Sequence, residues 1–244
     1  MFNPVIIIPC YNHVSALSAV LPRILQFKTA IIIVDDGCDI EQSEKLQQIC
    51  KSYDCTFIRH DVNRGKGAAM ISGFYKAYEM GYTHALQIDS DGQHDTNDIQ
   101  KFLSASEQQP NALIVGQPVY DDSAPKSRLV GRKITDFWVM VETFNRHMPD
   151  AMCGFRVYPL ATTVPLLKKL RFLRMGFDIE IMVKIYRSET PLVPIETKVI
   201  YPPDGTSNFR VFKDNVFISI MHTYLCVTIP LWQIQRLKRA CKRK

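Results

Sequence analysis

Short apolar runs alternate with amphipathic segments through the first 120 residues of the chain. Polar or turn residues bound the runs, and the segments between them repeat apolar side chains at helical spacing. Continuous apolar strands separated by helices are typical of a parallel sheet covered on both faces. The expected strands are Val5–Ile8, Ala30–Val34, Cys55–Ile58, Ala85–Ile88 and Leu113–Val115, and the expected helices are Val14–Phe27, Glu41–Tyr53, Gly67–Met80 and Asn97–Gln108.

The alternation weakens after Val115. A long helix is expected over Leu129–Phe144, followed by strands at Gly154–Tyr158 and Val193–Tyr201 with a helix, Asp178–Tyr186, between them. Neither a low-complexity linker nor an internal repeat is visible in the sequence. We therefore expect one α/β domain with a Rossmann-like, mostly parallel sheet and helices on both faces.

Polar clusters follow the first four expected strands. They are Pro9–His13, Asp35–Asp39, Asp61–Lys66 and Asp89–Asp95. Ligands of parallel α/β sheets bind at the carboxyl ends of the strands. Four converging clusters predict one binding site at this edge of the sheet.

Asp89 and Asp91 are the most informative pair in these clusters. They directly follow an apolar strand, and alternate side chains of an extended chain point the same way. Two such carboxylates suit a hard dication that takes phosphate oxygens as its remaining ligands. The pair therefore predicts a site for a nucleoside diphosphate and a divalent metal ion.

Two other uses of the pair can be weighed. A calcium-binding EF-hand loop would need Gly and Glu where this chain has His94 and Gln100, which argues against such a loop. The structural alternative is a turn in which Asp95 or Asn97 caps the following helix.

The segment Asn63-Arg64-Gly65-Lys66-Gly67 opens an expected helix. Exposed backbone amides, the helix N-terminus and the Lys66 ammonium suit a phosphate group. The segment has neither the Walker A spacing nor the dinucleotide-binding glycine pattern. An ordinary glycine-rich helix start is the alternative interpretation.

Two further loops could bind a nucleoside. Asp35 and Asp36 can accept hydrogen bonds from a base or a ribose, although Asp-Gly also favours a plain turn. Tyr11 and Asn12 offer an aromatic face and an amide to a nucleobase, and the alternative is a helix entry capped by Asn12.

The net charge of +6 is localised at one end of the chain. Six Lys and Arg residues and no acid lie in Arg236–Lys244, so the rest of the chain is balanced and nucleic acid is not an expected partner. Before this tail, Asn215–Gln235 has no charged residue, yet polar side chains interrupt its apolar pattern. A helix lying on a membrane surface and anchored by the basic tail is the favoured interpretation, with core packing or a membrane span as alternatives.

The cysteines and the N-terminus bear on the cellular compartment. The seven cysteines are odd in number and form no close metal-type pair, which favours reduced thiols in a cytosolic setting. The first residues enter a strand without a basic region or a cleavage site, so no signal peptide is expected.

Five segments occur in a recognisable order: Ile-Pro-Cys-Tyr-Asn (8–12), Val-Asp-Asp-Gly (34–37), Asn-Arg-Gly-Lys-Gly (63–67), Asp-Ser-Asp-Gly-Gln-His (89–94) and Cys-Gly-Phe-Arg (153–156). Together they resemble family 2 glycosyltransferases with the GT-A fold. The branch that the chain resembles includes dolichol- or polyprenyl-phosphate sugar synthases and related bacterial enzymes of lipid and aryl polyene biosynthesis. The resemblance extends to about Arg210.

The resemblance implies a role for particular residues of this chain. Donor binding is implied for Pro9, Tyr11, Asn12, Asp35, Asp36, Asn63, Lys66, Gly67 and Asp89, and for Ser207 and Arg210 in a loop that closes over the donor. Mg²⁺ or Mn²⁺ would be bound by Asp89 and Asp91, with Gln93 close by. The segment from Asp150 to Phe155 would line the acceptor side, and Phe177–Glu180 would begin a helix near the reaction centre.

A hydroxyl acceptor requires a base, whereas an acceptor phosphate is already ionised and requires cations. Candidate bases are Asp150, Asp178 and Glu180. A phosphate could be clamped by Arg128, Arg132, Arg156 or Arg210. The usual basic residue before the Gly-x-Ser segment is replaced by Tyr201-Pro202-Pro203-Asp204, which weakens the expected clamp.

The resemblance thus implies an inverting transfer of one sugar from a UDP- or GDP-type sugar to a lipid-linked or apolar acceptor, by a peripheral protein on the cytoplasmic face of the membrane. The domain division would be a glycosyltransferase domain, 1–212, with a nucleotide half (1–118) and an acceptor half (119–212), and an apolar helix with a basic tail, 213–244. The alternatives are a nucleotidyltransferase and a non-catalytic nucleotide-sugar binder.

Overall fold

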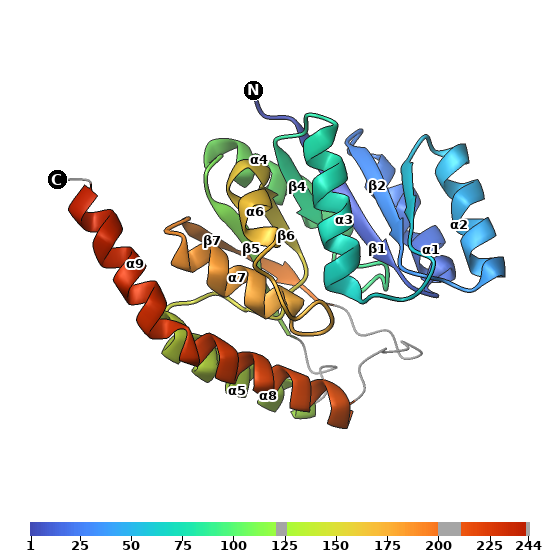
Figure 1. The fold of residues 1–244 in the computed structure, drawn as a ribbon. Helices are drawn as coiled ribbons and strands as arrows, with labels where there is room; N and C mark the ends of the chain where they lie inside the picture. The colour runs from blue at the N-terminus through green and yellow to red at the C-terminus, as the bar shows by residue number, and fades with distance from the viewer. Residues whose placement is uncertain (121–125, 200–210, 243–244) are drawn as a thin grey trace.

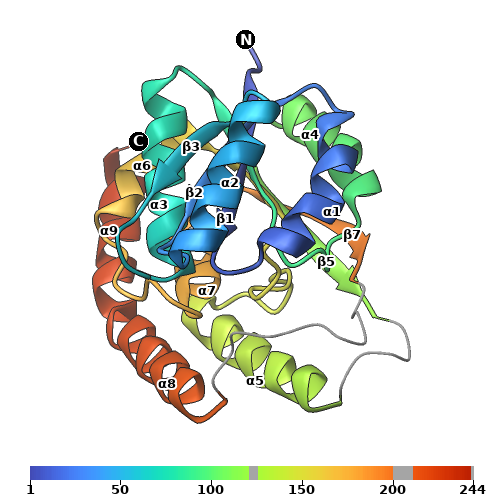
Figure 2. The same cartoon turned by 90° about the vertical axis from the view of Figure 1, so that its right-hand side faces the viewer.

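The structure is a computed structural model, and it describes residues 1–120, 126–199 and 211–242. A seven-stranded sheet has the order β3-β2-β1-β4-β6-β5-β7 and carries helices on both faces (Figures 1 and 2). The strands are β1 (Pro4–Cys10), β2 (Ala30–Asp35), β3 (Thr56–Arg59), β4 (His84–Gln87), β5 (Leu113–Val119), β6 (Arg156–Pro159) and β7 (Leu192–Lys198). The helices are α1 (Val14–Leu25), α2 (Ile40–Ser52), α3 (Lys66–Glu79), η1 (Thr96–Asp98), α4 (Ile99–Gln108), α5 (Lys126–Thr143), α6 (Leu160–Leu167), α7 (Phe177–Arg187), α8 (Val211–Val227) and α9 (Ile229–Lys242).

The first half of the sheet is parallel, as its sequence pattern predicts. Strands β3, β2, β1 and β4 are parallel neighbours, so their carboxyl ends meet at one edge. The second half differs, because β6 is antiparallel to both β4 and β5. The expected strand at Gly154–Tyr158 is therefore confirmed as β6, but it lies between strands that precede it in the chain.

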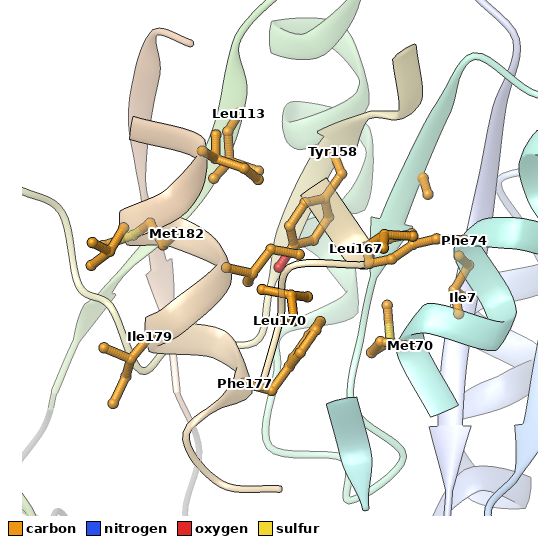
Figure 3. Close-up of a cluster of buried hydrophobic side chains, with 14 of the residues drawn as sticks. Ile7, Met70, Phe74, Leu113, Tyr158, Leu167, Leu170, Phe177, Ile179 and Met182 are labelled. Carbon is orange, nitrogen blue, oxygen red and sulfur yellow. The ribbon is translucent and has the colours of Figure 1, made fainter. Parts of the chain in front are cut away.

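Each face of the sheet has its own apolar core. In β1, Val5 and Ile7 point to one face, whereas Ile6 and Ile8 point to the other. The first core includes side chains of α3, α6, α7 and α8, and the second includes those of α1, α2 and α4. Figure 3 shows the first core, where Phe74 and Tyr158 pack edge to face with ring centroids 4.9 Å apart. Burying a large apolar side chain contributes about 1.5–3 kcal/mol, so these two layers fix the strand ends firmly.

The expected apolar segment Asn215–Gln235 forms two helices. Helix α8 ends at Val227, and Pro230 lies in the first turn of α9. Proline is tolerated in a first helical turn but would remove a hydrogen bond from the interior of a continuous helix. In the part of the chain that the structure describes, no single helix is long and apolar enough to cross a membrane, whereas α8 and α9 reach that length and composition only as a pair bent by 42°.

Candidate functional site

The loop after β3 is held in place by Asp36. Its carboxylate accepts hydrogen bonds from the backbone N–H groups of Arg64, at 3.1 Å, and Gly65, at 2.7 Å. His60 Nδ1 lies 2.7 Å from Asp36 Oδ1, and His60 Nε2 lies 2.9 Å from Ser72 Oγ. Asp36 is buried and serves to shape the loop that presents Lys66.

Gly65 allows this loop to turn into α3. Its φ is +99°, a conformation that side chains with a Cβ rarely adopt, and an added Cβ would lie 2.6 Å from the backbone oxygen of Leu173. The next residue but one, Gly67, donates its backbone N–H to that same oxygen at 2.8 Å. The segment after α6 is thereby joined to the start of α3.

Asp35 has no surface left for a ligand. It is fully buried and accepts hydrogen bonds from the Cys38 N–H, at 2.7 Å, and from Ser43 Oγ, at 2.5 Å. The structure thus favours the strand-end turn as the role of Asp35. Asn12 is likewise no helix cap: α1 has His13 at its N-cap, and Asn12 Oδ1 accepts from the Asp39 N–H at 3.1 Å.

A charged cluster forms where β4 ends. Lys66 Nζ lies 2.8 Å from Asp89 Oδ1 and 2.8 Å from Asp178 Oδ2, so one ammonium bridges two carboxylates. Burial alone would lower the pKa of Lys66, but the carboxylates of Asp178 and Asp89 outweigh it and hold this pKa above its usual value. Burial likewise acts to raise the pKa of Asp89, yet Lys66 and then His94 hold it below its usual range. Lys66 and Asp89 are therefore both charged at neutral pH.

Two buried residues, Gln87 and Tyr158, position Asp178 through a chain of hydrogen bonds. Gln87 Nε2 donates to Asp178 Oδ1 at 2.9 Å, and the Tyr158 hydroxyl donates to Gln87 Oε1 at 3.0 Å. Both side chains are fully buried, on β4 and β6. Sequence reasoning did not single out either residue, although the polar Gln87 within the apolar run Ala85–Ile88 was an available signal.

Gly154 brings a distant segment against this cluster. An added Cβ would lie 2.6 Å from both Asp89 Oδ2 and Lys66 Nζ, so no larger residue fits without displacing charged groups. The segment Cys153–Arg156 therefore belongs to the site. Arg156 itself is fully buried and donates to the backbone oxygens of Asp178, at 2.6 Å, and Ala151, at 2.8 Å, which fixes this segment against the start of α7.

The turn after β4 contains the predicted metal ligands. Asp91 Oδ1 accepts from the Gln93 N–H at 3.0 Å across Gly92, and both side chains are partly exposed. Asp95 caps the short helix η1 by accepting from the Asn97 N–H at 3.0 Å, so the capping role weighed for this segment is present too. Helix capping in this turn is thus performed by Asp95, which is not one of the predicted metal ligands.

The residues of the site fit a metal ion that is shared with a ligand. Among the described residues, no group of three or more His, Cys, Asp or Glu side chains is arranged to hold a metal ion. Asp89 Oδ1 is buried and has Lys66 beside it but accepts no well-formed hydrogen bond. One or two carboxylates completed by phosphate oxygens and water is the ligand set that Mg²⁺ uses with nucleotides.

The other candidate bases are engaged by protein donors. Asp150 pairs with Arg132 and accepts from the N–H groups of Met152, at 2.7 Å, and Cys153, at 2.8 Å. Glu180 is fully buried and accepts from two backbone N–H groups, of Arg171 and Phe172, while Lys184 lies 2.7 Å away. Both carboxylates hold loops in place.

The remaining predicted residues are less well defined. Asn63 lies in the loop before α3, where its side-chain oxygen accepts from Arg174 at 3.0 Å. Pro9 and Tyr11 lie at the end of β1 and just beyond it. Ser207 and Arg210 lie outside the described residues, as does the side chain of Arg128.

Comparison with known proteins settles the family. The family model "Glycosyl transferase family 2" matches residues 5–162. The chain belongs to glycosyltransferase family 2. Its matched region contains the ends of strands β1 to β4 and Gly154, and therefore Lys66 and Asp89 of the cluster, whereas Asp178 lies beyond it.

Several curated relatives are named as transferases that act on polyprenyl phosphates. The chain is 25% identical over 217 residues to a UDP-N-acetylglucosamine–dolichyl-phosphate N-acetylglucosaminyltransferase of Methanococcus voltae, covering 80% of this chain and 85% of that protein. It is 23% identical to the dolichyl-phosphate beta-glucosyltransferase of Saccharomyces cerevisiae, over 89% of this chain and 74% of the relative. An undecaprenyl-phosphate 4-deoxy-4-formamido-L-arabinose transferase of Proteus mirabilis is 24% identical, over 72% and 58% of the two chains.

Solved structures show the same fold. Glucosyl-3-phosphoglycerate synthase of Mycobacterium tuberculosis in complex with UDP has a TM-score of 0.67 and 12% identity, over 93% of this chain and 80% of that chain. The same enzyme with Mn²⁺ and UDP-glucose gives a TM-score of 0.66, over 89% and 76% of the two chains. The expected GT-A fold is therefore confirmed, and the chain is a glycosyltransferase.

Proposed function

We propose that this enzyme transfers one sugar, with inversion, from a nucleoside-diphosphate sugar to a polyprenyl-phosphate acceptor at the cytoplasmic surface of the membrane. The single observation that carries the proposal is the Lys66 ammonium held between the carboxyl groups of Asp89 and Asp178 at the end of β4. The names of the curated relatives support the acceptor class, and the UDP complexes of the structural neighbour support a UDP-type donor, with GDP as the alternative.

Mg²⁺ or Mn²⁺ would be held by Asp89 and Asp91, with Gln93 near them. When bound, such an ion would neutralise charge that develops on the departing nucleoside diphosphate. Lys66 supplies a second positive charge at the same place and sits at the N-terminus of α3, where anions are favoured. Asp178, fixed by Gln87, holds the Lys66 ammonium beside Asp89.

The engagement of the carboxylates supports a phosphate acceptor rather than a hydroxyl. A hydroxyl must lose a proton to a base, whereas a phosphate monoester is already ionised at neutral pH. Asp150 is paired with Arg132, Glu180 is buried under loop amides, and Asp178 is bound by Lys66 and Gln87. Three carboxylates in structural contacts suit a reaction that needs no protein base.

The membrane location rests on the C-terminal helices and the basic tail. The bent pair of α8 and α9 ends in a run of Lys and Arg residues, as expected for a peripheral protein on an anionic surface. The division into a transferase domain and a C-terminal helical part stays a prediction.

A paired-acceptor assay tests this function. The enzyme is incubated with UDP- and GDP-sugars and Mn²⁺, and with either a polyprenyl phosphate or the polyprenol of the same length. We expect glycosyl transfer to the phosphate alone, with release of nucleoside diphosphate. Transfer to the polyprenol would contradict the phosphate acceptor, and release of pyrophosphate would indicate a nucleotidyltransferase instead.

A further inference from the structure

Lys66 places its positive charge on a carboxylate that is predicted to bind a metal ion. Its Nζ donates a hydrogen bond to Asp89 Oδ2 at 2.8 Å and lies 2.8 Å from Asp89 Oδ1 as well. The same ammonium lies 2.8 Å from Asp178 Oδ2. Both oxygens of Asp89 therefore face one positive charge, and a divalent ion that bound this carboxylate would compete with the ammonium for it.

The surrounding residues give a divalent ion few other oxygens at this place. Asp178 is held by Gln87, whose Nε2 donates to Asp178 Oδ1 at 2.9 Å. An added Cβ on Gly154 would lie 2.6 Å from both Asp89 Oδ2 and Lys66 Nζ, so this backbone segment closes one side of the pair. Among the residues that the structure describes, no group of three His, Cys, Asp or Glu side chains is arranged to hold a metal ion. A divalent ion by itself would therefore gain few ligands by displacing the ammonium.

The side chain of Lys66 can leave this position, although its backbone is fixed. Lys66 is the first residue of α3, and the backbone N–H groups of Gly65 and Gly67 on either side of it donate hydrogen bonds to other segments. The four-carbon stem of lysine is flexible. The side chains of Lys66 and Asp89 are 21% and 24% exposed, so the pair has an open side. The ammonium can thus turn towards a ligand while the carboxylates stay in place.

A nucleoside diphosphate supplies what a metal ion alone does not. Its phosphate oxygens offer the ammonium an anionic partner, and the N-terminus of α3, where Lys66 lies, favours an anion. Phosphate oxygens also complete the coordination of Mg²⁺ beside one or two carboxylates. With the diphosphate both cations have ligands of their own, whereas without it they compete for Asp89.

We propose that Lys66 is a competing cation, which keeps a divalent ion off Asp89 until a nucleoside diphosphate draws the ammonium away. Metal ion and nucleotide then bind as a pair, and each raises the affinity of the enzyme for the other. This inference rests on the proposed metal-dependent function. It deepens that function by naming the residue that couples the metal ion to the donor.

A plain phosphate contact is the competing interpretation of Lys66. In that case the metal ion would need the nucleotide only because phosphate oxygens complete its coordination. Removing the ammonium would then weaken nucleotide binding and leave the affinity for the metal ion alone unchanged. A competing cation predicts instead that the affinity for the metal ion alone rises when the ammonium is removed.

Titration of Mn²⁺ into the full chain, followed by the electron paramagnetic resonance signal of the free ion, separates the two interpretations. Lys66→Met removes the charge and keeps an unbranched apolar side chain, and Lys66→Arg keeps the charge. The matched control is Lys45→Met, which removes an ammonium from an ion pair with Glu41 on α2. Each protein is titrated with Mn²⁺ alone and in the presence of UDP or GDP. Thermal unfolding is measured for all proteins.

We expect Lys66→Met to bind Mn²⁺ alone at least about tenfold more tightly than the wild type, because two cations at one carboxylate repel each other. Lys66→Arg and Lys45→Met should bind Mn²⁺ alone as weakly as the wild type. The preferred nucleotide should tighten Mn²⁺ binding to the wild type, and this gain should be smaller in Lys66→Met. Equal affinity of the wild type and Lys66→Met for Mn²⁺ alone would overturn the inference.

A measurement on the wild type decides the matter if Lys66→Met does not fold. The ¹⁵Nζ resonance of Lys66, assigned by its loss in Lys66→Arg, reports the partners of the ammonium. It should stay in place when Mg²⁺ alone is added and shift when Mg²⁺ is added with the preferred nucleotide. An equal shift with Mg²⁺ alone, or no shift when both are bound, would overturn the inference.

The same proteins separate this inference from the proposed function. If the wild type and Lys66→Met bind Mn²⁺ alone equally well, and the wild type transfers sugar to a polyprenyl phosphate with Mn²⁺, the inference fails and the proposed function stands. If the Mn²⁺ affinities are as expected but no sugar is transferred to the phosphate, the proposed function fails and the inference stands.

Discussion

The charged cluster at the end of β4 and the exposed apolar side chains of α5, α8 and α9 are built in opposite ways. In the cluster, charged side chains that are partly or largely buried contact one another, as in the bridge from Lys66 to Asp89 and Asp178. On α8 and α9, large apolar side chains such as Phe212 and Leu231 are exposed, whereas the polar contact between His222 and Glu142 is buried. The charged cluster is built from short segments near strand ends, whereas the exposed apolar side chains lie on helices that are distant from one another in sequence.

The largest effect is expected from removing Asp89, a predicted metal ligand. Asp89→Ala should lower the transfer rate about 10²–10³-fold, because a preorganised group that stabilises developing charge is worth about this much. Steady-state assays with polyprenyl phosphate measure the rate. The control is Asp54→Asn, at an exposed aspartate far from the cluster with φ of +52°, which Asn also tolerates. If Asp89→Ala were as active as Asp54→Asn, the cluster would not take part in the transfer reaction.

Adding one methyl group at a glycine should have opposite effects in the two regions, at Gly154 beside the cluster and at Gly131 on α5. In Gly154→Ala the new Cβ would overlap Asp89 and Lys66, so we expect the transfer rate to fall at least about tenfold and stability to drop by about 1–3 kcal/mol. Gly131→Ala on α5 is the matched control, because an added Cβ there meets nothing within 4 Å. This control should gain about 0.5–1 kcal/mol from helix propensity. Urea unfolding measures stability, and initial rates measure transfer. A Gly154 variant that behaves like the control would contradict the close contact of Gly154 with Asp89 and Lys66.

Removing the hydrogen bond from Tyr158 to Gln87, which positions Asp178, should have an intermediate effect. Tyr158→Phe leaves the buried Gln87 oxygen without its donor, which should cost about 1–3 kcal/mol of stability. We also expect a lower kcat with little change in KM for the donor, because Asp178 and Lys66 lose their fixed positions. Tyr78→Phe, on the exposed surface of α3, should change neither quantity. A normal kcat for Tyr158→Phe would make Gln87 a packing residue only.

The buried contact between Glu142 of α5 and His222 of α8 predicts a smaller effect, a pH dependence of stability. Burial raises the pKa of Glu142, against the lesser influence of His222. A carboxyl group whose folded pKa is raised binds its proton more tightly in the folded state, so its contribution to stability declines as pH rises above about 4.5. When the pH is raised from 4.5 to 7, the free energy of unfolding of Glu142→Gln should therefore fall less than that of the wild type. Urea unfolding at several pH values measures this difference, and parallel curves would contradict it.

The nucleotide half was largely predictable because its signals are local. Apolar strands of four to seven residues end in polar loops, and parallel pairing brings these loops to one edge. Sequence spacing placed Asp89 and Lys66 at that edge. It could not show that Asp35 is buried in a turn, or that Asp36 holds the loop of Arg64 and Gly65, because those contacts depend on how neighbouring strands pack.

The acceptor half was less predictable because its contacts are distant. Gln87 reaches Asp178 across 91 positions, and Glu142 reaches His222 across 80. The short helix α6 was not expected, since its eight residues contain Pro165 and follow directly on β6. The break between α8 and α9 follows from Pro230, but the exposure of the apolar stripe on α5 could not be read from its sequence pattern, which also suits a core helix.

The central claim is that Asp89 binds a divalent ion shared with the donor diphosphate. The most direct measurement is calorimetric titration of UDP and GDP into the wild type and Asp89→Asn, with and without Mn²⁺. We predict that Mn²⁺ tightens binding of the preferred nucleotide to the wild type at least tenfold and has no such effect on the variant. Equal affinity with and without Mn²⁺ in the wild type, or an undiminished Mn²⁺ effect in Asp89→Asn, would contradict the account.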